Sequence, residues 1–289
     1  MKARGTKWGM YLLTLWVVPF VVFGLRVEVP AGPLECVEGQ EGLSVCLGVP
    51  YAVPPVGDMR WKPPVAHPDW DEVRDATEYG PNCLQVSQPN LVNVSYDPLS
   101  EDCLFLNFWA PAVVSQASLP VLVFVHGGGF YLGGSSDATL NGTLLASRGA
   151  VVVTLNYRLG SLGFLALEEL KAEPGSGGST GNYGIMDQQE ALRWVRRNVG
   201  ALGGDPARVL LFGQSAGANS MFVHVASPLS EGLFSRVGAM SGYPRGVYTL
   251  AGAEQVGGAI VGRTPCGDAP SGQLLECLRG LDGGTVVAA

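Results

Sequence analysis

The sequence predicts an α/β fold with a mostly parallel central sheet, because apolar runs of strand length alternate with helical segments after residue 118. Two runs, at 121–125 and 150–155, are continuous and rich in β-branched residues, and two shorter runs follow at 209–212 and 237–240. Runs of this kind are typical of strands that are buried on both faces. Strands that alternate with helices indicate a doubly wound sheet.

An amphipathic helix is expected between the second and third runs. Its apolar positions fall on one helical face and its polar positions on the other. The apolar face carries Leu192, Val195, Val199 and Leu202, and the polar face carries Gln188, Gln189, Arg193 and Arg196. Residues 216–226 are also compatible with a helix.

The first part of the mature chain has a different pattern. Residues 25–110 contain shorter apolar runs, more turns and proline pairs at 54–55 and 63–64. We expect an antiparallel edge region with a surface loop bounded by cysteines. Residues 173–181 are rich in glycine and serine and are expected to be a connector. Residues 25–289 are therefore expected to form one α/β domain or part of a larger one.

Residues 1–24 have the pattern of a secretory signal peptide. Basic residues open the chain, an apolar run follows over 8–23, and Gly24 supplies a small residue for cleavage. A membrane anchor is the alternative, but the run is short for a span and carries Pro19 near its end. No other segment is apolar for long enough to cross a bilayer, so no stable membrane span is expected.

The cysteines and sequons fit export to an oxidising compartment. None of the cysteines forms a CxxC pair, and three histidines are too few for a zinc site, so disulfides are favoured. The six cysteines are Cys36, Cys46, Cys83, Cys103, Cys266 and Cys277. Asn93 and Asn141 begin N-glycosylation sequons. The chain is expected to be secreted or lumenal, and its net charge of −7 disfavours nucleic acid as a partner.

The pattern G-x-S-x-G occurs twice, around Ser179 and around Ser215. A catalytic serine of this type needs a strand before it and a helix directly after it, so that it stands at the tip of a strained turn. Ser215 follows the run at 209–212 and precedes the helical stretch 216–226. Ser179 follows a Pro/Gly/Ser segment that cannot be a strand. Ser215 is therefore the candidate nucleophile, and Ser179 is a loop residue.

A glycine run follows the strand at 121–125. Residues 126–130 read His-Gly-Gly-Gly-Phe. Acyl transfer places negative charge on a carbonyl oxygen, which backbone N–H groups stabilise strongly, and glycines let the backbone approach closely. A flexible turn is the alternative, but the place of the run, after a buried strand and upstream of Ser215, favours an oxyanion hole.

With these motifs in place, the chain resembles the carboxylesterase/cholinesterase family (type-B carboxylesterases) from about residue 29 to about residue 281. The resemblance is carried by segments 48–52, 54–61, 100–107, 156–158, 181–188 and 212–217. It implies an α/β-hydrolase fold and a serine carboxylic ester hydrolase that acts on a small-molecule ester without cofactor or metal. Ser215 would be the nucleophile, and the N–H groups of Gly128, Gly129 and Ala216 would form the oxyanion hole.

The resemblance also implies structural pairs. These are the disulfides Cys83–Cys103 and Cys266–Cys277 and the ion pairs Arg60–Glu101 and Arg158–Asp187. Cys36 and Cys46 have no counterpart that we can place, and the sequence leaves their pairing open. Gln214 stands where many members have Glu. Tyr96 is the one aromatic residue between Cys83 and Cys103, which argues against acetylcholine as substrate, because cholinesterases stack choline on a tryptophan in that loop.

The family's catalytic acid and histidine come later than the residues matched here. His224 lies nine residues along the helix after Ser215, roughly 13 Å along its axis, and is expected to be a packing residue. His67 and His126 are not credible bases either. We therefore expect a chain truncated before the triad acid and histidine, and inactive or weakly active as it stands. The alternatives are a non-catalytic cholinesterase-like adhesion or ligand-binding protein and a lipase-like protein; the oligomeric state is left open.

Overall fold

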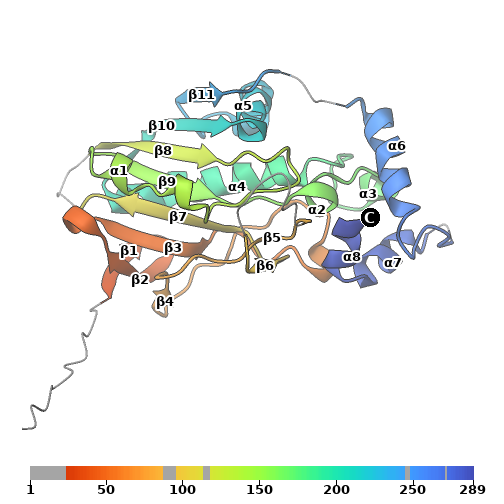
Figure 1. Ribbon diagram of the computed structural model, residues 1–289, viewed down its shortest axis with the longest axis horizontal. Helices are drawn as coiled ribbons and strands as arrows, with labels where there is room; N and C mark the ends of the chain where they lie inside the picture. Colours follow the sequence, from red (N-terminus) through yellow and green to blue (C-terminus); the bar gives the residue numbers. More distant parts are fainter. Residues whose placement is uncertain (1–23, 87–95, 113–117, 245–247, 271) are drawn as a thin grey trace, which may run out of the picture.

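The computed structural model describes residues 24–86, 96–112, 118–244, 248–270 and 272–289. Residues 1–23 of the proposed signal peptide, and Asn93, thus lie outside the described residues. Within these ranges, a mixed sheet forms the body of the molecule, and a group of short helices lies beyond one end of its strands (Figure 1). No helix in the described ranges is long and apolar enough to cross a bilayer.

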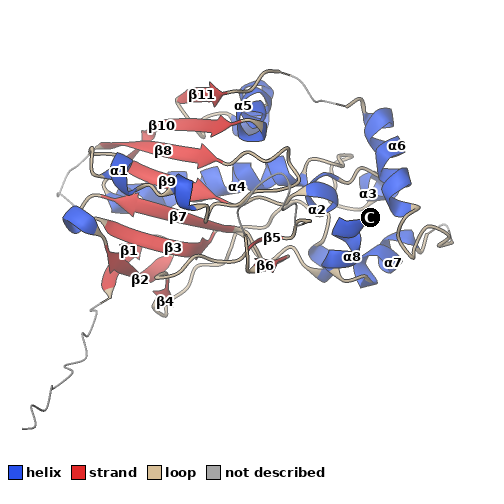
Figure 2. Ribbon diagram, in the orientation of Figure 1, coloured by secondary structure: helices blue, strands red, loops and turns tan. Residues whose placement is uncertain are grey.

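The sheet is antiparallel at one edge and parallel at the other (Figure 2). In spatial order its strands are β1 (Leu25–Val29), β2 (Gly32–Glu38), β3 (Ser44–Pro50), β7 (Phe105–Ala110), β9 (Val151–Leu155), β8 (Leu119–Val125), β10 (Gly204–Gln214) and β11 (Arg236–Met240). Short β4 (Arg74–Asp75) pairs with β2, and β5 (Asn82–Cys83) pairs with β6 (Leu99–Ser100). The predicted α/β fold with an antiparallel N-terminal edge is confirmed.

The four predicted strands are present, but they differ in burial. All five residues of β9 are buried, as expected for a central parallel strand. The run at 237–240 was expected to be buried as well, and this was wrong. In β11, Val237 and Met240 are 42% and 45% exposed, and β10 is the one neighbour of this strand among the described strands.

Helices α4 (Tyr183–Asn198) and α5 (Ala216–Ala226) correspond to the two predicted helices. The apolar face of α4 and the 3₁₀ turn η4 (Val199–Leu202) packs into the main core, as predicted. The polar face is not uniformly solvated, however. Arg193 is exposed, whereas Gln188 and Gln189 are buried because they hydrogen bond to side chains of α5 and of the turn that follows it.

The remaining helices are short. They are α1 (Thr143–Ala146), α2 (Gly160–Phe164), α3 (Glu168–Ala172), α6 (Leu250–Val261), α7 (Leu274–Gly280) and α8 (Gly283–Ala288). The other 3₁₀ turns are η1 (Gln40–Gly42), η2 (Gly57–Met59), η3 (Ala138–Leu140) and η5 (Pro228–Ser230). Apolar residues of α2, α3, α6, α7 and α8 form a second core, which is centred on side chains such as Trp61 and Leu278.

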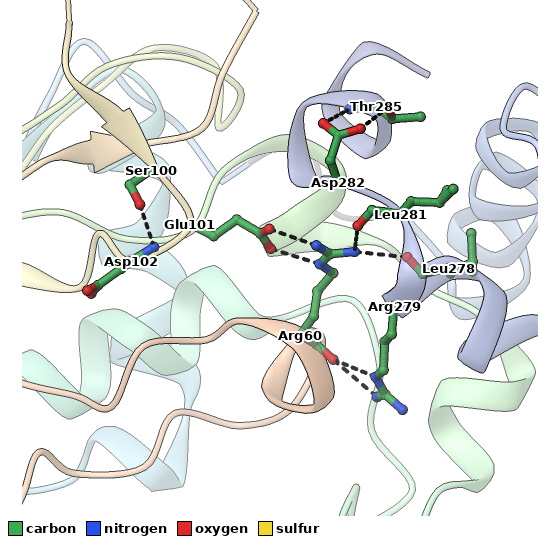
Figure 3. A network of polar contacts seen from close by, with 9 residues as sticks. All are labelled: Arg60, Ser100, Glu101, Asp102, Leu278, Arg279, Leu281, Asp282 and Thr285. Atoms are coloured by element: carbon green, nitrogen blue, oxygen red, sulfur yellow. Dashed lines mark hydrogen bonds and ion pairs between the residues drawn. The ribbon is translucent and has the colours of Figure 1, made fainter.

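A network around Arg60 links this helical group to the loops of the sheet (Figure 3). The Arg60 guanidinium binds both oxygens of Glu101, with distances of 2.7 and 2.8 Å. It also donates to the carbonyl oxygens of Leu278 and Leu281. Arg279 donates in turn to the carbonyl oxygen of Arg60. Four of the five N–H groups of the guanidinium are thus used, and they fix α7 against the loop that follows η2.

Three disulfides join the described residues: Cys36–Cys46, Cys83–Cys103 and Cys266–Cys277. The last two are the pairings implied by the family resemblance. Cys36–Cys46 cross-links β2 to β3, so these two cysteines, whose pairing the sequence left open, are bonded to each other.

The second implied ion pair, Arg158–Asp187, is the most deeply buried one in the described residues. The two side chains are 3% and 0% exposed. Asp187 accepts from Nε and Nη2 of Arg158 at 2.8 and 2.7 Å, and from the backbone N–H of Arg158 at 3.0 Å. The pair therefore fixes the start of α4 to the segment that follows β9.

We expect Asp187→Asn to lower the free energy of unfolding by about 3–5 kcal/mol, because it leaves the Arg158 charge buried without a carboxylate. Asp69→Asn is the matched control. It breaks a bidentate pair with Arg197 in which both partners are about half exposed, so its effect should be much smaller. Urea unfolding of the two variants measures the difference, and equal destabilisation would contradict the prediction.

Candidate functional site

Ser215 stands between the last residue of β10 and the first residue of α5. Its backbone has φ +54° and ψ −119°, a conformation that is costly for a residue with a side chain. Ser215 N–H donates to the carbonyl oxygen of Met240 at 2.9 Å, and Asn219 N–H donates to the Ser215 carbonyl oxygen at 2.9 Å. These bonds hold a strained strand-to-helix turn, as a nucleophile elbow requires.

The elbow packs directly on the end of β8. Strands β8 and β10 are parallel neighbours, with Val125 opposite Gly213. A Cβ on Gly217 would lie 2.1 Å from the carbonyl oxygen of Val125, so only glycine permits this approach. The chain leaving β8 therefore passes beside the chain that turns at Ser215.

The glycine run at 127–129 is thereby placed next to the elbow. A Cβ on Gly127 would lie 2.8 Å from the carbonyl oxygen of Gln214 and 3.2 Å from the Cβ of Ser215. Gly128 and Gly129 have φ of +106° and +63°, a region that side chains rarely adopt. The run thus turns sharply beside Ser215 without side chains of its own.

His126 is buried below this turn. Its ring stacks on Tyr157 with centroids 4.4 Å apart, and its Nδ1 lies 2.8 Å from the carbonyl oxygen of Gly127. Burial lowers the pKa of His126 to about 4, so the ring is neutral and Nδ1 carries the proton that is donated. The Gly127 carbonyl and the Gly128 N–H belong to one planar peptide. Fixing the carbonyl oxygen therefore also fixes the direction of the Gly128 N–H.

His224 is also buried, and both of its ring nitrogens hydrogen bond to residues other than Ser215. Its Nε2 lies 2.8 Å from Oε1 of Gln188, and its Nδ1 lies 3.0 Å from Oγ of Ser230. Gln188 Nε2 donates to Ser220 Oγ, which donates to the carbonyl oxygen of Ala216. The chain of hydrogen bonds thus runs from His224 to the first turn of α5. Sequence reasoning missed Gln188 because its place on a polar helical face gave no sign of burial.

No described residue supplies a base to Ser215. The third histidine, His67, contacts the carbonyl oxygen of Pro68 and the edge of Trp70. All three histidines of the chain are therefore placed, and none hydrogen bonds to Ser215 in the structure. The described residues also contain no group of three or more His, Cys, Asp or Glu residues that could hold a metal.

The other predicted sites are at the surface or in loops. Ser179 lies in a turn, where its N–H donates to the carbonyl oxygen of Ser176. Asn141 is exposed, and its Oδ1 accepts from the N–H of Thr143. Tyr96 lies near Asp137, with its hydroxyl 3.4 Å from Oδ2 of Asp137.

Comparison with known proteins gives consistent matches. Residues 26–289 match the Carboxylesterase family. A fumonisin B1 esterase of Sphingopyxis macrogoltabida is 44% identical over 78% of this chain and 42% of its own length. A cocaine esterase of Oryctolagus cuniculus is 40% identical over 86% of this chain and 47% of its own length. The solved structure of a thermophilic pNB esterase superposes with a TM-score of 0.81, at 35% identity, over 91% of this chain and 52% of its own. The chain thus spans about half the length of the relatives it matches.

The two buried histidines predict a loss of stability in acid. His126 and His224 have pKa values of about 4 in the folded chain, mainly because of burial, against about 6.5 when unfolded. Between these values the unfolded chain binds more protons, so the free energy of unfolding falls as the pH drops from about 6.5 to about 4. Each imidazole should contribute about 3 kcal/mol to this fall.

We therefore expect His224→Gln to reduce the difference in unfolding free energy between pH 7 and pH 4.5 by about 2–3 kcal/mol. Urea unfolding at the two pH values measures it. The control is His67→Gln, which removes an imidazole that lies near the surface. An unchanged difference in His224→Gln would contradict the prediction.

Proposed function

The chain belongs to the Carboxylesterase family, and from this premise we propose that it carries the nucleophile and the oxyanion hole of a serine carboxylic ester hydrolase. One observation carries the proposal. Ser215 sits at positive φ between β10 and α5, directly beside a glycine run with positive φ of its own. This arrangement leaves the serine hydroxyl and backbone N–H groups free to act on one carbonyl group.

In the proposed reaction, Ser215 Oγ attacks the ester carbonyl and the negative charge moves to the carbonyl oxygen. The N–H groups of Gly128, Gly129 and Ala216 stabilise that charge. The general base takes the proton of the Ser215 hydroxyl and passes it to the departing alcohol as the intermediate collapses to an acyl-enzyme, which water hydrolyses to the acid. Loss of one oxyanion donor typically costs about 10²–10³ in rate. His126 supports the assignment of Gly128, because it holds the peptide that carries this N–H.

We propose that the general base and its carboxylate are contributed by polypeptide beyond these 289 residues. Two observations support this. Each of the three histidines is engaged away from Ser215, and the chain spans about half the length of its relatives. The sequence of the transcript or locus beyond Ala289 tests this assignment.

The substrate class that we propose is a small-molecule carboxylic ester. Relatives named as esterases of fumonisin B1 and cocaine support it. Tyr96 is the single aromatic residue of the 84–102 segment, and its hydroxyl lies near Asp137, which disfavours acetylcholine. The three disulfides indicate an oxidising extracellular or lumenal environment, and we propose that the protein is secreted.

Asn141 should carry an N-linked glycan when the chain is made in secretory cells, because the acceptor residue itself is exposed. Its side chain can leave the bond to Thr143 N–H without disturbing a buried group. We expect Asn141→Gln to lower the mass of the secreted chain by one glycan. Glycosidase treatment with intact mass spectrometry checks this, and masses of parent and variant that differ before treatment only by the methylene group that the substitution adds would refute it.

The 289-residue chain should hydrolyse p-nitrophenyl acetate only slowly. A serine at its ordinary acidity is a poor nucleophile without a base. Oxyanion hole and binding alone give roughly 10³–10⁴-fold acceleration over water. Ser215→Ala, assayed beside the parent, should differ from it by at most a few fold. Fast turnover that disappears in Ser215→Ala would show that a base has been overlooked.

A further inference from the structure

A cavity of about 250 Å³ lies away from Ser215, between the loop that follows η2 and the Gly/Ser connector after α3. The first turn of α4 completes its wall with Tyr183 and Met186. Ser179, the serine of the second G-x-S-x-G sequence, also lines it. None of the residues that we assign to catalysis lines this cavity.

The wall of the cavity is mostly apolar. Trp61 and Leu170 belong to the second core and are almost fully buried, and they are joined by Pro63, Pro64 and Val65 from the loop. A dry cavity of about 150 Å³ binds benzene, so this one has room for a larger apolar body. Small-molecule sites combine such walls with a few polar groups that fix orientation.

One charged group at the cavity, the ammonium group of Lys62, has no partner among the described residues. Both oxygens of Glu173 are taken by Arg279, at 2.6 and 2.7 Å, and this pair holds the pKa of Glu173 below its usual range. Lys62 interacts with Glu173 electrostatically, without a hydrogen bond. Its backbone N–H donates to the carbonyl oxygen of Met59, but its ammonium group makes no hydrogen bond or ion pair with the described residues. Asp58, the other carboxylate that acts on Arg279, is exposed to solvent.

We propose that this cavity is a second small-molecule site that takes an organic carboxylate with an apolar body. The carboxylate pairs with the ammonium group of Lys62 at the mouth, and the apolar body lies against Trp61, Leu170 and Met186. Arg279 already neutralises Glu173, so the ammonium group of Lys62 is the charge that is left to attract a ligand, which favours an acid over the corresponding alcohol. Binding does not depend on Ser215 and leaves the proposed ester chemistry unaffected.

Isothermal titration calorimetry of the 289-residue chain with octanoate and with octan-1-ol tests the proposal. We expect octanoate to bind at least tenfold more tightly than octan-1-ol. In Lys62→Met this preference should disappear, and in Ser179→Phe both ligands should lose measurable binding, because the new ring fills the cavity. Lys171→Met is the matched control: Lys171 pairs with Glu168 outside the cavity, and octanoate should bind as it does to the parent.

Lys62→Met and Ser179→Phe separate this site from the proposed active site, because neither residue belongs to the latter, and Ser215→Ala should bind octanoate unchanged. Circular dichroism of each variant confirms folding before titration, and Lys62→Met decides the question if Ser179→Phe does not fold. Absence of octanoate binding to the parent, equal affinity for the two ligands, retention of the preference in Lys62→Met, or loss of binding in Ser215→Ala would each overturn the proposal.

Discussion

The close backbone approach between the end of β8 and the turn after β10 is the constraint on which the candidate site depends. The two strands are parallel neighbours, so their carboxyl ends meet at the same edge of the sheet. Because Gly217 has no side chain, the turn can contact the carbonyl oxygen of Val125. Because Gly127 has none, the glycine run can contact the carbonyl oxygen of Gln214. Side chains at either position would separate the glycine run from Ser215. The geometry of the site thus comes from the backbone of two adjacent strands rather than from loops that move independently.

Much of this arrangement could be predicted from the sequence, because it depends on local signals. Apolar runs predicted the four strands of the parallel half, and the strand-turn-helix context separated Ser215 from Ser179. The predictions that were wrong concern the burial of individual residues, which depends on tertiary contacts. Gln188 looked solvent-facing by periodicity, yet it is buried because His224 of α5 meets it. The exposure of β11 follows from its place at the edge of the sheet, which no property of residues 237–240 reveals.

Two buried arginine forks add directional contacts between segments that are far apart in the sequence. Arg158 joins the segment after β9 to α4 through Asp187, and Arg60 joins the loop after η2 to Glu101 and α7. The family resemblance implied both carboxylate partners but not the carbonyl groups that complete the Arg60 fork. Such partners are backbone atoms and leave no trace in residue type. The two cores are therefore held in register by directional contacts.

The edge strand β11 has a kinetic consequence. It is apolar, half exposed, and paired on one side only among the described strands. Such an edge is a template for strand addition by another molecule. Folding of one chain is first order, whereas edge-to-edge association is second order in chain concentration. The yield of monomeric chain should therefore depend on how dilute the chain is while it folds, and crowding favours the association.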